Sequence, residues 1–285
     1  MPNKNQTVEY QISPIKQLIR VALLVLRSVL PIRSFETVYN FLRGIYQFCG
    51  HWNYILKTRF LDITADDETV LKHSLTRKLL PFTMGGWKAM HNAFESVALV
   101  EHANIAGAIV ECGVARGGTS AIMAEADRAL GGNKRHKWLF DSYEGLPAPG
   151  QLDFEDGRVG EVVSPLGAGD CVGTEAEVRF LMFNILKFET NNVTLVKGWF
   201  DKTVPKMKVE VGPICILRLD GDWYESTKVP LENFFDQVTS GGVIIIDDYA
   251  TCYGSRRAID EFFEERQLNF KLQPDGRGGA WFQKS

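Results

Sequence analysis

The sequence predicts an α/β fold built on a mostly parallel sheet, and two observations support this. From residue 107 onward, short apolar runs alternate with longer segments whose apolar residues recur at helical spacing. This alternation is typical of parallel strands in a sheet whose faces are covered by helices. Two of the runs, Leu217–Tyr224 and Val243–Tyr249, also pass directly from apolar residues to two acidic residues. Because the carboxyl ends of parallel strands meet at the edge where ligands bind, these runs predict a site at that edge.

Composition sets the broad class of the protein. The chain has 285 residues, of which 45% are hydrophobic and 24% charged, enough for one large domain or one domain with an appendage. Its formal net charge of −3 argues against a general nucleic-acid binder, which would carry a basic excess. The five cysteines lack CxxC spacing, so we expect neither a zinc site nor a disulfide framework, and a cytoplasmic location.

The first part of the chain is basic and has a helical pattern. Ile15–Leu30 has apolar residues at helical spacing and ends at Pro31, and Phe35–Phe48 and Trp52–Phe60 are apolar and rich in aromatic residues. Residues 1–60 contain eight basic and two acidic residues, so this part carries +6 and the remainder −9. The longest uncharged run in the first helix, Val21–Leu26, is far shorter than the roughly 20 residues of a membrane span.

We therefore predict that residues 1–82 form a basic helical arm or cap. A cap, or an arm that joins two copies in a homo-oligomer, is favoured over an amphipathic helix lying on an anionic membrane surface. The charge asymmetry keeps the peripheral membrane contact open. Asp62–Leu79 is expected to be a helix or linker, with its first turn at Asp66-Asp67-Glu68.

Residues 83–285 contain the alternating elements. The expected helices are Trp87–His102, Thr119–Leu130, Ser226–Thr239 and Ser255–Arg266. The expected strands are Gly107–Cys112, Lys137–Phe140, Asn192–Val196, Ile214–Leu219 and Gly242–Ile246, with a closing hairpin of Phe270–Leu272 and Ala280–Phe282. Residues 148–176 are rich in glycine, proline and acidic residues and break the alternation. A loop of this length inside a compact domain is usually functional, so we expect a lid-like insertion, with surface disorder as the alternative.

Four aspartates follow the two strand ends noted above. Asp220 and Asp222 close one run and Asp247 and Asp248 close the other, and such clustered hard oxygen ligands suit Mg²⁺ or a similar cation. The alternative is that these residues only form turns after strands. Arg218 lies inside the first run, and we expect it to pair with an acidic neighbour.

A glycine-containing turn and a later aspartate predict a second half of the site. Val110–Ser120 reads as a strand, a turn and a helix start, but its G-x-x-x-G-G spacing matches neither a dinucleotide fingerprint nor a P-loop. Glu111 beside this turn suits a ligand with a cationic amino group and no phosphate, such as S-adenosylmethionine (SAM). Asp141 ends the next strand and could accept hydrogen bonds from ribose hydroxyls, or it could cap a turn.

Together these motifs resemble the macrocin O-methyltransferase family. The resemblance is carried by Thr83-Met84, Val110–Gly118, Asp141–Pro147, Gly198–Phe200, Leu217–Thr227 and Gly241–Tyr249. It implies a Rossmann-like class I methyltransferase fold, with a mostly parallel seven-stranded sheet, helices on both faces and an N-terminal helical appendage. Residues 83–285 would then be the SAM-binding methyltransferase domain, and the enzyme would methylate a hydroxyl of a sugar or glycosylated small molecule.

The resemblance also implies a role for individual residues. Asp220, Asp247 and Asp248 would bind the divalent cation, and Asp222 would be the catalytic base. The SAM-binding residues would be Thr83, Met84, Glu111, Gly113, Arg116, Gly117, Gly118, Thr119, Ser120, Asp141, Ser142, Gly198 and Trp199. Two alternatives remain: a metal-dependent nucleotide-sugar glycosyltransferase that uses Asp220-Gly221-Asp222 as a DxD motif, and a non-catalytic peripheral membrane-binding protein.

Overall fold

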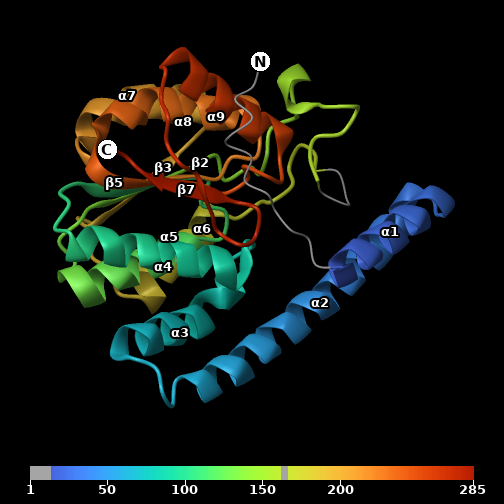
Figure 1. Ribbon diagram of the computed structural model, residues 1–285, viewed down its shortest axis with the longest axis horizontal. Coiled ribbons are helices and arrows are strands. Elements are labelled where there is room, and N and C mark those ends of the chain that lie inside the picture. The colour runs from blue at the N-terminus through green and yellow to red at the C-terminus, as the bar shows by residue number, and fades with distance from the viewer. Residues whose placement is uncertain (1–13, 162–165) are drawn as a thin grey trace.

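A seven-stranded sheet organises the chain. The computed structural model describes residues 14–161 and 166–285, which form an α/β body and a long helical arm (Figure 1). The strand order is β3-β2-β1-β4-β5-β7-β6. The first five strands of this order are parallel, and β7 is antiparallel to both β5 and β6. The prediction of a mostly parallel seven-stranded sheet with helices on both faces is therefore confirmed.

The strands occupy nearly the predicted segments. They are β1 (Ala108–Cys112), β2 (Lys137–Asp141), β3 (Val193–Lys197), β4 (Ile214–Leu219), β5 (Val238–Ile246), β6 (Gln273–Pro274) and β7 (Ala280–Gln283). Every residue of β1 and β4 is buried, as a central parallel strand covered on both faces requires. From β1 the chain adds β2 and then β3 on one side, and from β4 it adds β5 on the other side. The order in which strands are added therefore reverses between the neighbours β1 and β4. Ligands bind at such switch points.

Helices cover both faces of the sheet (Figure 1). One face packs on α3 (Asp67–Leu79), α4 (Gly86–His102), α5 (Gly118–Ala126) and α6 (Glu175–Arg179), and the other packs on α7 (Phe200–Val211), α8 (Tyr224–Phe234) and α9 (Tyr253–Glu265). Short helical turns lie at Leu80–Phe82, Asp127–Gly131, Gln151–Asp153, Phe180–Ile185 and Phe235–Gln237. Each face therefore has its own hydrophobic core.

Several segments differ from the sequence prediction. Helix α6 was not predicted, and Val238 and Thr239, expected at the end of a helix, begin β5. Helix α7 was not predicted; Pro205 lies inside it and cannot donate a helical hydrogen bond, yet Val204 and Val211 bury one face of the helix. The closing hairpin is present, but its first strand begins at Gln273 rather than Phe270. Phe270 instead stacks on Phe282, with ring centroids 4.7 Å apart, and so contributes to the core rather than to the strand ladder.

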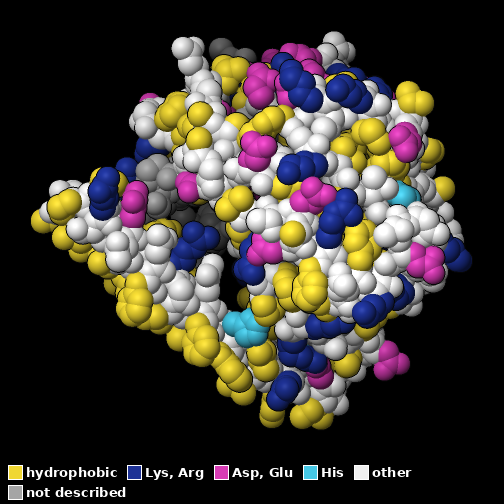
Figure 2. Space-filling view, turned by 180° about the vertical axis from the view of Figure 1, so that it is seen from behind, with side chains coloured by type: hydrophobic (Ala, Val, Ile, Leu, Met, Phe, Trp, Pro, Cys, Tyr) yellow, Lys and Arg dark blue, Asp and Glu magenta, His cyan; other side chains and the backbone are white. Residues whose placement is uncertain are grey.

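The arm consists of two helices that extend away from the body. They are α1 (Pro14–Val29) and α2 (Ile32–Leu61), and Pro31 separates them as predicted. The two predicted apolar segments within residues 35–60 form one continuous helix. Most apolar side chains of the arm are exposed, and Figure 2 shows hydrophobic side chains along its outer edge. No helix among the described residues is long and apolar enough to cross a membrane.

A polar cluster joins the end of the arm to the body. The Asp62 carboxylate accepts a hydrogen bond from Arg77 at 2.7 Å and pairs with the His73 ring at 2.5 Å. The Tyr54 hydroxyl lies 2.7 Å from Nε2 of His91 on α4. Helix α3 begins at the predicted turn, where the Asp66 side chain accepts from the backbone N–H of Thr69. The domain boundary at residue 82 stays a prediction, although α3 itself packs on the body.

The acidic insertion is tied to the body at several points. Its Asp153 carboxylate is buried and accepts from the backbone N–H groups of Tyr224, at 2.6 Å, and Gly150, at 2.7 Å. Glu155 pairs with Arg256 of α9 at 3.0 Å. Residues 162–165, which belong to the predicted lid, lie outside the described residues. The lid role of residues 148–176 stays a prediction.

Candidate active site

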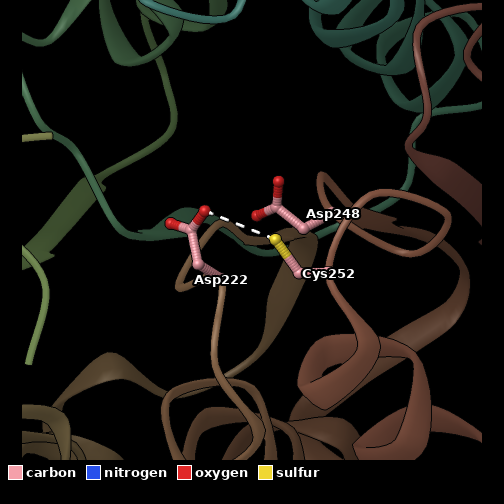
Figure 3. Close-up of side chains that lie close together, drawn as sticks. All are labelled: Asp222, Asp248 and Cys252. Atoms are coloured by element: carbon pink, nitrogen blue, oxygen red, sulfur yellow. Dashed lines mark hydrogen bonds between the residues drawn. The ribbon is translucent and has the colours of Figure 1, made fainter. Parts of the chain in front are cut away.

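The predicted acidic strand ends meet at the carboxyl edge of the sheet. Asp220 follows β4, and Asp247 and Asp248 follow β5, its neighbour in the sheet. One oxygen from each of these three carboxylates lies within 4.8 Å of the others. Asp222 belongs to a second cluster with Asp248 and the Cys252 thiol (Figure 3). The structure thus brings all four aspartates together.

These aspartates border a cleft of about 1270 Å³. Of the residues predicted for the site, nine line this cleft: Met84, Gly113, Asp141, Ser142, Trp199, Asp220, Asp222, Asp247 and Asp248. The other predicted residues are not among those that line the cleft: Thr83, Glu111, Arg116, Gly117, Gly118, Thr119, Ser120 and Gly198. The SAM contacts predicted for this second group stay predictions.

The glycine turn is shaped by contacts within the chain. Gly113 has φ +99°, and a Cβ there would lie 1.6 Å from the backbone carbonyl oxygen of Asp220. A Cβ on Gly118 would lie 2.7 Å from the carbonyl of Phe82 and the amide of Thr83. Only glycine therefore lets the turn after β1 pack against the end of β4 and against the segment before α4. The sequence signal was read as an approach to a ligand, and the structure shows an approach to neighbouring backbone.

Asp141 fixes the same turn. One of its carboxylate oxygens accepts from the backbone N–H groups of Val114, at 2.7 Å, and Ala115, at 2.9 Å, and the other accepts from Tyr143 at 2.6 Å. The pKa of Asp141 is raised by burial, although the hydrogen bonds from these N–H groups act to lower it. The turn-capping alternative is thus present in the structure. The ribose contact stays a prediction, since a carboxylate has further lone pairs to offer.

Glu111 and Ser120 form a buried pair behind the turn. The Ser120 hydroxyl donates to one Glu111 oxygen, and Arg218 donates to the other at 2.7 Å. Glu111 is fully buried, and this burial raises its pKa to about 7 despite the nearby guanidinium. Both carboxylate oxygens are therefore already engaged, and the predicted contact between Glu111 and a SAM amino group stays a prediction.

Arg218 connects the two halves of the site. Its guanidinium donates to Glu111, to Asp220 at 2.7 Å and to Asp247, which confirms the expectation of an acidic partner. Burial alone would lower the pKa of Arg218, but the carboxylates of Asp220 and Glu111 hold it above its usual range. The residue is 1% exposed. It therefore acts as an internal counter-ion for carboxylates on three neighbouring strands.

Arg277 was not predicted and has no recognisable signal in the sequence. It comes from the turn between β6 and β7, and its guanidinium donates to the carboxylate and the backbone carbonyl of Asp247. Together, Arg218 and Arg277 engage both carboxylate oxygens of Asp247. Binding of a cation by Asp247 would need at least one of these two contacts to be shared or released.

Asp222 and Asp248 are both buried at the cleft. Asp222 has a positive φ of +58° and accepts a hydrogen bond from the Cys252 thiol at 3.6 Å. Burial and the charge of Asp220 raise the pKa of Asp222 to about 7, and burial with the charge of Asp222 raises the pKa of Asp248. The second oxygen of Asp248, Oδ2, is buried without a hydrogen-bond partner among the described residues. An all-carboxylate oxygen set with such an open atom fits a hard divalent cation.

Helix α2 forms the other side of the cleft and was also missed. Four of its residues line the cleft and recur at the spacing of one helical face: Glu36, Tyr39, Asn40 and Arg43. Their pattern was assigned to the basic arm because sequence spacing does not show what a helix faces. Further unpredicted lining residues include Cys171, Cys252, Thr251 and Lys202.

The fold and the site agree with the comparisons to known proteins. A family model described as Macrocin-O-methyltransferase matches residues 60–284. The demethyldecarbamoylnovobiocin O-methyltransferase of Streptomyces niveus is 34% identical over 207 residues, covering 71% of this chain and 76% of that protein. The 8-demethyl-8-(2,3-dimethoxy-alpha-L-rhamnosyl)-tetracenomycin-C 4'-O-methyltransferase of Streptomyces olivaceus is 35% identical over 200 residues, covering 70% and 74%.

Solved structures give the same result. The O-methyltransferase NovP superposes with a TM-score of 0.63 at 32% identity, covering 72% of this chain and 82% of that one. The calicheamicin methyltransferase CalS11 covers 99% of this chain and 98% of that one with a TM-score of 0.56, and at 19% identity it supports the fold alone. The predicted class I methyltransferase fold is confirmed, and the glycosyltransferase and non-catalytic alternatives are set aside. The chain belongs to the macrocin O-methyltransferase family and is an SAM-dependent O-methyltransferase.

Proposed function

We propose that the enzyme transfers the methyl group of SAM to a hydroxyl of a sugar or glycosylated small molecule, with a divalent cation held by Asp220, Asp247 and Asp248. The observation that carries this proposal is the meeting of four aspartates at the switch point, next to the glycine turn that ends β1. The sugar acceptor is supported by the relatives, one of which is named for methylation of a rhamnosyl group.

The chain's own residues supply the groups that such a reaction needs. Asp222 borders the same cleft as the three proposed ligands, so its carboxylate can take the proton of an acceptor hydroxyl placed there. The hydroxyl oxygen then forms a bond to the methyl carbon while the carbon–sulfur bond breaks, and the electron pair stays on the sulfur of S-adenosylhomocysteine (SAH). Alignment of these atoms in the cleft would contribute much of the rate enhancement. A bound divalent cation would lower the pKa of a hydroxyl that contacts it.

Substitution of the proposed base tests this assignment. Asp222→Asn should bind SAH with unchanged affinity in calorimetry but lose methyl transfer to a panel of free sugars, nucleotide-linked sugars and glycosides. Glu225→Gln is a matched control, since Glu225 is an exposed carboxylate of the same cleft, and it should retain transfer. Turnover by Asp222→Asn close to that of the wild type would remove Asp222 from the role of base.

The cation is tested separately. After EDTA treatment, calorimetric titration with Mg²⁺ or Mn²⁺ in the presence of SAH should show binding that Asp248→Asn weakens by about tenfold or more. Methyl transfer should be lost in EDTA and return with the metal. Full activity in EDTA would refute the metal-dependent part of the proposal and leave the methyltransferase assignment unchanged.

A peripheral membrane contact is a second candidate role for the arm alone. It is favoured by exposed apolar side chains on α1, among them Leu18, Val25 and Val29, in a segment that also carries basic residues (Figure 2). Co-sedimentation with anionic liposomes should be lost when Val25 and Val29 are both replaced by Glu. If that variant sediments with liposomes as the wild type does, the membrane contact is excluded. A concentration-dependent dimer in analytical ultracentrifugation would instead favour an arm that joins two copies of the chain.

A further inference from the structure

A thiol lies among the acidic groups of the active site. Asp222 follows β4, Asp248 follows β5, and Cys252 precedes α9, so three separate segments bring these side chains together (Figure 3). One ligand atom from each lies within 4.8 Å of the others, and the Cys252 sulfur is 3.6 Å from Asp222 Oδ1. Cys252 is 2% exposed and Asp248 is 6% exposed. These groups form a buried cluster that is distinct in composition from the three carboxylates beside it.

An unsatisfied acceptor in this cluster points to a missing ligand. Oδ2 of Asp248 is buried and has no hydrogen-bond partner among the described residues. A buried carboxylate oxygen without a partner is costly, because it has lost its hydration and gained nothing in return. Thr251 donates to the other oxygen of Asp248, at 3.2 Å, and leaves this one open. A cation bound to the Asp248 carboxylate, in this cluster or in the neighbouring three-carboxylate position, would satisfy it.

The sulfur determines which cation fits best. Mg²⁺ binds oxygen ligands, whereas thiolates favour Zn²⁺ and other softer ions. In tetrahedral zinc sites, a sulfur and an oxygen ligand lie about 3.6 Å apart, given the usual zinc–sulfur and zinc–oxygen bond lengths. That spacing matches the distance between Cys252 and Asp222. The Cys252–Asp222 pair is thus already spaced for a tetrahedral ion, and Asp248 offers a third ligand atom within 4.8 Å of both.

We propose that Asp222, Asp248 and Cys252 form a second cation position, which takes a thiophilic divalent cation such as Zn²⁺. On binding, a metal–sulfur bond forms, the thiol proton is released to solvent, and no oxidation or reduction takes place. Because Asp248 belongs to both clusters, the two positions cannot be filled independently.

Occupation of this position has a consequence that rests on the proposed function. The positive charge of the cation would lower the pKa of Asp222 and so weaken it as a base, and the cation would draw Asp248 away from the neighbouring three-carboxylate position. Zn²⁺ would therefore inhibit methyl transfer, in competition with Mg²⁺. Cation binding itself does not depend on the identity of the acceptor or on catalysis.

A spectroscopic titration tests the position without any substrate. EDTA-treated full-length protein is titrated with Co²⁺ or Cd²⁺, and thiolate-to-metal charge transfer is followed in the near ultraviolet. The wild type should develop a saturable band at one ion per chain. Cys252→Ser and Cys252→Ala, with folding verified by SAH binding, should both lose the band, and Cys171→Ser, which alters another thiol of the cleft, should retain it. Absence of the band in the wild type, or its persistence in folded Cys252 variants, would overturn the proposal.

A second readout separates this proposal from the proposed reaction. With an active acceptor, Zn²⁺ should inhibit the wild type at a concentration about tenfold or more below that required for Cys252→Ser, each measured against its own uninhibited rate. Equal sensitivity would refute the inhibitory role. If no acceptor is methylated, the proposed function fails while the charge-transfer titration still decides the cation position.

Discussion

Replacing Arg218 by methionine tests whether one buried guanidinium holds the site together. The substitution keeps most of the side-chain volume and removes the charge that contacts Glu111, Asp220 and Asp247. The three carboxylates would not suffer equally. The Asp220 side chain is 28% exposed and can be hydrated, and Asp247 keeps its contact with Arg277.

Glu111 has no such compensation, so it determines how much unfolding free energy Arg218→Met should lose. The residue is fully buried, and Ser120 would be its remaining partner among the contacts described above. Removing one partner of a buried ion pair costs about 3–5 kcal/mol of unfolding free energy. At about 2 °C per kcal/mol for a chain of this size, the melting temperature should fall by roughly 6–10 °C. Differential scanning calorimetry measures this directly.

The pH dependence of that deficit identifies its cause. The pKa of Glu111 is already raised to about 7 by burial, and loss of the guanidinium would raise it further. A carboxyl whose folded pKa exceeds its unfolded pKa binds its proton more tightly in the folded state, so the deficit grows as pH rises. Arg218→Met should therefore lose more stability at about pH 8 than at about pH 5.

An exposed ion pair provides the control. Arg179→Met removes a surface contact with Glu175, 2.7 Å long, and should cost about 0.5 kcal/mol or less. The reasoning would be refuted if Arg218→Met melted within about 1 °C of this control, or if its deficit were larger at the lower pH.

Three further substitutions test other parts of the structure. Gly113→Ala places a Cβ 1.6 Å from the carbonyl oxygen of Asp220 and should cost at least about 4 kcal/mol in urea unfolding. Gly132→Ala, with φ +74°, ψ +28° and ordinary van der Waals contact only, should cost about 1 kcal/mol. Similar costs would refute the crowding argument. Burial lowers the pKa of His91 to about 3, so the unfolded chain gains a proton that the folded chain does not, and stability falls as pH drops below the usual value of 6.5. His91→Gln should reduce the loss of unfolding free energy between about pH 7.5 and about pH 5.5 by about 1 kcal/mol, and an unchanged loss would contradict this. Arg43→Ala removes a positive charge from the α2 side of the cleft. It should raise KM for the acceptor by about tenfold with no change in SAH affinity. An unchanged KM, or an equally large loss of SAH affinity, would place Arg43 outside the acceptor subsite.

The sequence by itself determined the order of the elements and the edge that carries the chemistry. Apolar runs separated by helical patterns specify a parallel sheet, because only strands buried on both faces are continuously apolar. The acidic pairs after β4 and β5 then had to meet, since neighbouring parallel strands end at the same edge. The alternation of elements and the position of Asp220, Asp222, Asp247 and Asp248 were predictable for this local reason.

What lies around those aspartates was decided by the tertiary structure alone. Arg277 and the α2 face reach the cleft from segments that are distant in sequence from the aspartates, and no local spacing records that they come together. Gly113 shows the same limit, because the sequence marked it as special but not that it contacts neighbouring backbone, whereas the turn-capping contact of Asp141 was one of two roles that the sequence left open. Local pattern fixes backbone periodicity, whereas side-chain partners depend on which surfaces pack together once the chain has folded.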